Sequence, residues 1–86
     1  MKRVYFLNEE NGYLGETSRM SEISSYVGAQ VRRYRKACGM TIQQMADQIH
    51  KSRATVCKYE NGEIVLDVET LYEISQVLQI SFSQLT

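Results

Sequence analysis

The sequence contains no proline and no tryptophan, only one histidine and two cysteines, and no low-complexity segment or internal repeat. Cys38 and Cys57 are too few for a disulfide-rich scaffold, and a reducing compartment would keep both as thiols. No apolar run approaches the roughly 18 residues that a membrane span requires. The apolar stretch 4–7 is too short for a signal peptide, because charge returns at Glu9. We therefore expect a cytoplasmic protein that does not enter a membrane.

Residues that could form a catalytic or metal site are equally few. Cys38, His50 and Cys57 lack the close CxxC or HxxxH spacing of metal ligands, so we expect no metal site. The single histidine belongs to no assembled Ser/His/Asp set, and no phosphate-binding loop is present. A chain of 86 residues also has little room for a deep substrate pocket. The sequence predicts neither an enzyme nor a cofactor-binding protein.

The length and composition fit one small globular domain. At about 100–200 residues per domain, 86 residues make one domain rather than two. Hydrophobic residues make up 43% of the chain and charged residues 23%, which excludes a wholly disordered or a fibrous protein.

The net charge is zero, but the charges are separated along the chain. Residues 32–58 contain seven bases and one acid, Asp47, for a net charge of +6. Residues 59–86 contain five acids and no Lys or Arg, for a net charge of −5, and residues 1–31 carry −1. A basic middle beside an acidic end suggests a polyanionic partner, and a merely solvated charged face is the equally common alternative.

Hydrophobic spacing and capping residues predict five helices after residue 20. The first starts at Ser21, with Ser24 and Ser25 as alternative caps, and ends at Gly39, a residue type that suits the position just after a helix. Its apolar stripe consists of Ile23, Val27, Val31 and Tyr34. The other four are predicted after Thr41, over about 52–60, after Asp67, and over 82–85 behind Ser81.

Residues 1–20 follow a different pattern. Two short apolar runs, 4–7 and Tyr13-Leu14, flank a segment that ends in Asn11-Gly12, which is a hairpin signal. An isolated two-stranded hairpin is marginal in water, so it would have to pack on the domain or on a second copy. The sequence leaves open a short β-hairpin and a loose arm, and we expect the domain itself to cover residues 21–86.

The second and third predicted helices have the pattern of a helix-turn-helix motif. The second helix of such a motif enters the DNA major groove, about 12 Å wide, so its outer face must be small and carry hydrogen-bond donors. Arg53 is the strongest base-reading candidate, because Arg to guanine O6 and N7 is the commonest specific contact; a phosphate contact is the alternative. The residues expected to read bases are Arg53, Ala54, Thr55, Cys57 and Lys58.

A longer set of residues carries a resemblance to a known family. These residues are Val27-Gly28, Val31-Arg32, Tyr34-Arg35-Lys36, Gly39-Met40-Thr41, Met45-Ala46, Ser52, Thr55-Val56, Tyr59-Glu60-Asn61-Gly62, Glu69-Thr70-Leu71, Ile74 and Leu78. On this basis residues 27–85, about two-thirds of the chain, resemble the lambda-repressor/Cro-like (Xre-type) helix-turn-helix family. The resemblance implies an all-α domain of five helices, preceded by the β-hairpin or arm.

The resemblance also implies roles for individual residues. Arg35 would pair with Glu60, since its planar guanidinium suits a bidentate contact with a carboxylate, and the pair would present the Asn61 backbone to a phosphate. Arg32 and Arg33 would either contact phosphate or form a solvated back of the first helix. The residues expected at DNA phosphates are Thr41, Gln43, Lys36, Lys51, Ser52 and Asn61.

Two residues depart from the family pattern. Ile42 stands where the family often has a phosphate-contacting Gln, which leaves that contact to Gln43. His50 stands at a turn position that is usually Gly, because a positive φ is least costly for Gly. Histidine tolerates this region better than most residues, so we expect a small strain without loss of the fold.

Two functions from different classes remain open. The first is a sequence-specific DNA-binding regulator, a homodimeric repressor on an inverted repeat, with recognition helices about 34 Å apart. The second is an antitoxin-type or adaptor protein that uses the same fold to bind a protein partner such as a toxin. The +6 segment favours double-stranded DNA, and the zero net charge favours the adaptor.

Overall fold

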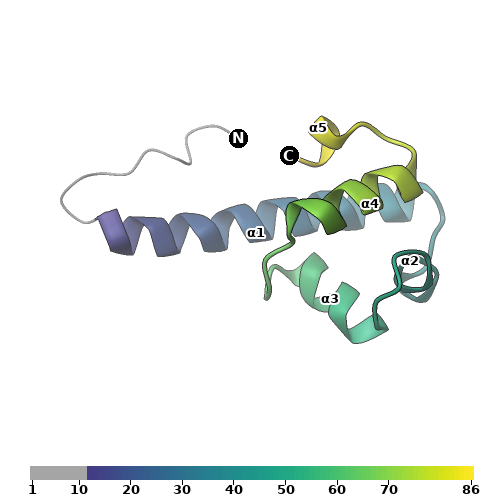
Figure 1. Ribbon diagram of the computed structural model, residues 1–86, viewed down its shortest axis with the longest axis horizontal. Coiled ribbons are helices and arrows are strands. Elements are labelled where there is room, and N and C mark those ends of the chain that lie inside the picture. Colours follow the sequence, from purple (N-terminus) through teal and green to yellow (C-terminus); the bar gives the residue numbers. More distant parts are fainter. Residues whose placement is uncertain (1–11) are drawn as a thin grey trace.

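The computed structural model describes residues 12–86, with side chains from Glu22 onward. Its five helices are α1 (Gly12–Ala37), α2 (Ile42–Gln48), α3 (Arg53–Asn61), α4 (Val68–Leu78) and α5 (Phe82–Leu85). The helices α2 and α3 lie on one side of α1 and α5 lies on the opposite side, with α4 running alongside α1 (Figure 1). The expected all-α domain of five helices is confirmed.

The first helix begins earlier than the sequence indicated. It starts at Gly12 rather than Ser21, so Tyr13-Leu14, expected as a strand of a hairpin, is helical. The other expected strand, 4–7, lies outside the described residues. Extending an existing helix adds one hydrogen bond per residue, whereas a lone hairpin is marginal in water, which explains why the Asn-Gly signal was misleading. The first turns of α1 project beyond the other helices (Figure 1).

Side-chain caps begin the helices where the sequence predicted them. The Thr41 hydroxyl accepts from the Gln44 N–H (3.0 Å) while the Gln44 side-chain oxygen accepts from the Thr41 N–H (2.8 Å), which closes a capping box on α2. Ser52 caps α3, and Asp67 caps α4 by accepting from the Thr70 N–H at 3.1 Å. Hydrogen bonds from the Thr70 hydroxyl and backbone lower the pKa of Asp67 below its ordinary value.

Four helices are followed within two residues by a residue with left-handed backbone geometry. At the ends of α1 and α3 this residue is glycine, Gly39 (φ 71°) and Gly62 (φ 76°), which adopts the conformation without strain. At the ends of α2 and α4 it is His50 (φ 58°) and Gln79 (φ 59°). A side chain in this conformation costs about 1–2 kcal/mol, so the positive φ expected at His50 is confirmed, with its strain.

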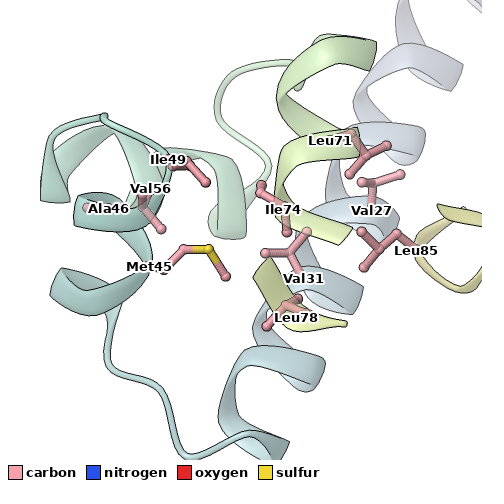
Figure 2. Packing of buried hydrophobic residues seen from close by; sticks show 10 residues of the cluster. All are labelled: Val27, Val31, Met45, Ala46, Ile49, Val56, Leu71, Ile74, Leu78 and Leu85. Atoms are coloured by element: carbon pink, nitrogen blue, oxygen red, sulfur yellow. The ribbon is translucent and has the colours of Figure 1, made fainter. Parts of the chain in front are cut away.

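A small hydrophobic core joins all five helices (Figure 2). Val31 of α1, Ile74 of α4 and Leu85 of α5 have no exposed surface, and each of these three helices contacts the other two. Met45 of α2 points toward Val31 and Ile74 and is also fully buried. The buried cluster consists of Val27, Val31, Met45, Ala46, Ile49, Val56, Leu71, Ile74, Leu78 and Leu85.

Two glycines allow α3 to sit directly on α1. A Cβ atom on Gly28 would lie 2.2 Å from the Tyr59 carbonyl oxygen and 2.9 Å from that of Glu60, closer than side chains approach a backbone. A Cβ on Gly62 would lie 2.8 Å from the Cα atom of Ser25. The crossing of α1 and α3 therefore has no room for a side chain at either contact.

Replacing Gly28 with Ala tests this close crossing, because the crossing decides whether the substitution lowers or raises the stability of the protein. Helix propensity alone would make the variant more stable by about 1 kcal/mol, whereas displacing α3 costs about 1–3 kcal/mol. We expect a net loss of stability, measured as a lower urea midpoint by circular dichroism. The neighbouring exposed Ala29→Ser should change stability by less than about 0.5 kcal/mol. A Gly28→Ala variant more stable than the parent would contradict the close crossing.

Candidate nucleic-acid interface

A buried ion pair connects α1 to α3. Arg35 Nε donates to Glu60 Oε2 at 2.6 Å, and Arg35 Nη2 donates to Glu60 Oε1 at 3.0 Å, which makes the contact bidentate. Arg35 Nη1 also donates to the Met40 carbonyl oxygen at 2.7 Å. This is the pairing that the family resemblance implied between Arg35 and Glu60.

The ion pair is shielded from water. The side chains of Arg35 and Glu60 are 7% and 4% exposed, so each charge depends on the other for compensation. The hydrogen bond to Glu60 raises the pKa of Arg35 above its already high ordinary value. Among the described residues, no buried side-chain nitrogen or oxygen lacks a hydrogen-bond partner. The third contact, to Met40, also ties the turn after α1 to the same guanidinium.

In the helix-turn-helix motif formed by α2 and α3, one side of α3 is buried and the other is exposed to solvent. Val56 and Tyr59 are buried and anchor α3 on the domain, as expected. Arg53, Ala54 and Lys58 are exposed, so three of the five residues expected to read bases share the solvent side of α3. This exposed surface is small at Ala54 and carries hydrogen-bond donors at its two ends, which is what a major-groove contact requires.

The other two expected base-reading residues are less accessible. Thr55 and Cys57 are half-buried, and the Thr55 hydroxyl lies 2.8 Å from the Ser52 hydroxyl. The Thr55 N–H also donates to the Ser52 hydroxyl, at 3.1 Å. Ser52 and Thr55 are therefore already committed to capping α3, which reduces what either can offer a ligand.

The residues expected at phosphates fall into two groups. Lys36 and Lys51 are exposed, and so are Thr41 and Gln43 at the start of α2. Thr41 is engaged on both sides by the capping box, and Gln43 Nε2 donates to Asp47 Oδ1 at 2.9 Å. Among the described side chains, neither lysine is in an ion pair, while the side chains at the start of α2 are already hydrogen-bonded.

Asn61 and Arg33 both make polar contacts within the chain. Asn61 is the last residue of α3, and its exposed side-chain amide donates to Glu63 Oε2 at 3.4 Å. Arg33 Nη1 donates to Gln30 at 3.3 Å, and Gln30 in turn donates to the Gln84 carbonyl oxygen in α5 at 3.1 Å. The guanidinium of Arg33 also lies 5.1 Å from the centre of the neighbouring Tyr34 ring.

The contacts of Arg33 favour one of its two interpretations. Gln30 joins Arg33 to α5, which lies on the side of α1 opposite to α2 and α3 (Figure 1), so these contacts favour the back of the first helix. Arg32 is exposed.

Sequence reasoning missed one residue of this surface. Asp47 is the only acid in the basic segment, and its carboxylate holds the Gln43 amide. The sequence did offer a signal for this contact, because Gln43 and Asp47 are four residues apart on α2 and such residues are neighbours on a helix surface.

Other site types find little support in the described part of the chain. Cys38 and Cys57 are both free thiols. Among the described side chains, no group of three His, Cys, Asp or Glu residues could hold a metal ion. Within residues 12–86, no helix has both the length and the apolar character to cross a bilayer.

Comparison with known proteins agrees with this geometry. A helix-turn-helix family model matches residues 31–85, which include the ion pair, both helices of the motif and the core residues of α4 and α5. The chain belongs to the lambda-repressor/Cro-like (Xre-type) helix-turn-helix family. The part of α1 before Val31, including the Gly28 contact, lies outside the matched range.

One curated relative supports the same family. The chain is 43% identical over 51 residues to "Cryptic phage CTXphi transcriptional repressor RstR" of Vibrio cholerae serotype O1 (strain ATCC 39315 / El Tor Inaba N16961). The similar region covers 59% of this chain and 46% of the repressor, so the chain matches less than half of that relative's length.

Removing one partner of the ion pair should destabilise the protein more than replacing both partners with apolar residues. In Glu60→Gln, Arg35 stays buried without a counter-charge, which we expect to cost about 3–5 kcal/mol, a large share of the stability of a small domain. Urea unfolding should show that the double variant Arg35→Met/Glu60→Leu recovers most of this loss. Exposed Glu63→Gln serves as the control and should stay close to the parent. A loss below about 1 kcal/mol in Glu60→Gln would show that the pair is not needed for the fold.

Proposed function

We propose that this protein is a sequence-specific transcriptional repressor that binds double-stranded DNA in the cytoplasm as a homodimer, with α3 in the major groove of each half of an inverted repeat. The observation that carries the proposal is the division of α3 into two sides. Its inner side is fixed to the domain by Val56, Tyr59 and the Glu60 ion pair, and its outer side presents Arg53, Ala54 and Lys58 to solvent.

The charge distribution supports a polyanion at this surface. The motif and the end of α1 belong to the +6 segment, whereas α4 and α5 belong to the segment with five acids and no Lys or Arg. Phosphates would be attracted to the first part and repelled by the second, which orients the domain on a duplex before any base is read.

The DNA contacts that we assign to individual residues follow from their exposure and their positive charge. Arg53 reads a base, because it is exposed at the first position of α3 and its fork matches guanine O6 and N7. Lys58 contacts the next bases or a phosphate, and Lys36 and Lys51 contact phosphates. The relative with a transcriptional repressor's name supports repression as the outcome.

Salt dependence of binding separates this proposal from a protein-binding adaptor. Anisotropy of a labelled duplex should show tight binding that weakens steeply with salt; about six neutralised phosphates correspond to a loss of roughly 10³-fold between 50 and 200 mM. The protein should also stay on a heparin column at low salt. If neither the duplex nor heparin retains it, the adaptor function with a protein partner takes the place of the repressor.

Removing Arg53 of α3 and removing Lys36 of α1 should change DNA binding in different ways. Arg53→Ala should lose about 1–3 kcal/mol of discrimination at one base pair per half-site, because a bidentate base contact is removed. Lys36→Ala should weaken binding evenly across all duplexes and reduce the salt slope by about one. The measurement is anisotropy against a panel of duplexes that differ at single base pairs. A uniform loss in both variants would mean that Arg53 contacts only the backbone.

A further inference from the structure

The hydroxyl groups of Ser52 and Thr55 form a hydrogen-bonded pair beside the outer side of α3. Their oxygens lie 2.8 Å apart, and the Ser52 oxygen also accepts from the Thr55 N–H at 3.1 Å. Ser52 is exposed and Thr55 is half-buried, so part of each side chain still reaches solvent. Thr55 precedes Lys58 by three residues and is therefore its neighbour on the surface of α3.

Only one hydrogen can lie between the two hydroxyl oxygens, and its origin fixes what each residue can still offer. A hydroxyl has one hydrogen to donate and two lone pairs that accept. When Thr55 donates, the Ser52 oxygen accepts from both the Thr55 O–H and the Thr55 N–H, so Ser52 can only donate further and Thr55 can only accept. When Ser52 donates, Thr55 keeps a hydrogen that it can donate outward.

A DNA phosphate beside Ser52 would select the first of these two states. The oxygens of a backbone phosphate accept hydrogen bonds, so Ser52 must donate to reach one. Lys51, directly before Ser52, is exposed and in no ion pair among the described side chains, and its charge attracts phosphate to this point. Once Ser52 donates to the phosphate, the hydrogen between the two oxygens comes from Thr55. Thr55 is then left as an acceptor with a methyl group beside it.

We propose that Thr55 is a specificity-determining residue, which accepts a hydrogen bond from the amino group of an adenine or a cytosine while Ser52 sets its polarity. In the major groove adenine N6 and cytosine N4 are donors, whereas guanine N7 and O6 and thymine O4 are acceptors. An acceptor at Thr55 therefore favours adenine or cytosine at the base that it contacts. This inference rests on the proposed function, and it adds to Arg53, a donor that selects guanine, a second contact of opposite polarity.

Removing the acceptor from the protein and removing the amino group from the DNA should have the same consequence. Thr55→Val keeps the side-chain shape and the N–H that caps onto Ser52, but it has no hydroxyl. Anisotropy against duplexes with single base-pair changes should find a base pair in each half-site at which the parent prefers an amino-bearing base about fivefold, and Thr55→Val should lose this preference. Replacing that adenine with purine, or that cytosine with 2-pyrimidinone, should weaken binding of the parent about fivefold more than binding of Thr55→Val.

Two further variants separate the contact from a structural effect. Thr55→Ser keeps the hydroxyl, is the matched control and should retain the preference. Ser52→Ala leaves the Thr55 hydroxyl free to donate or to accept, so the preference should disappear although Thr55 is intact. The double variant Ser52→Ala/Thr55→Val should lose no more discrimination at this base pair than either single variant. Circular dichroism checks that each variant is folded under the conditions of the binding measurement.

The possible results distinguish failure of this contact from failure of the proposed function. Sequence-specific binding in which Thr55→Val keeps every base preference of the parent would overturn the inference and leave the proposed repressor function standing. A preference that Thr55→Val loses and Ser52→Ala retains would overturn the control of polarity by Ser52. A parent protein without any sequence preference would contradict the proposed function itself, and the Thr55 contact with it.

Discussion

The buried contact between Arg35 and Glu60 determines how the proposed recognition helix is held. It joins the last turns of α1 and α3, and the third hydrogen bond of Arg35, to Met40, fixes the turn that leads into α2. A bidentate guanidinium–carboxylate contact restricts both distance and angle, which a single methyl contact in the core would not do. The ion pair therefore fixes both helices of the motif relative to α1.

The ion pair acts together with the absence of side chains at Gly28 and Gly62. Both glycines let the end of α3 approach the α1 backbone so closely that Glu60 is brought to Arg35 and shielded from water. The other side of α3 then faces solvent with Arg53, Ala54 and Lys58, and the acidic helices α4 and α5 make up another part of the domain. One packing arrangement thus produces both the stability of the motif and the separation of charge that the proposed DNA binding uses.

Local signals were sufficient for the elements that they specify. Thr41, Ser52 and Asp67 begin helices because short polar side chains reach the N–H groups of the first turn, and this is visible in the sequence. The positive φ at His50 was expected from the family resemblance, in which this turn position is usually Gly. The ion pair itself came from resemblance to a family, not from spacing, since nothing local links residues 25 positions apart.

Features that depend on tertiary contacts or on competition between structures were missed. The early start of α1 at Gly12 reflects the advantage of extending an existing helix over forming a lone hairpin. The contacts of Arg33 depend on Gln30 and, through it, on the distant α5. Selection of bound duplexes from a random pool by the purified protein tests the central claim most directly. The account predicts an inverted repeat with guanine in each half-site; no enrichment of any sequence would contradict it.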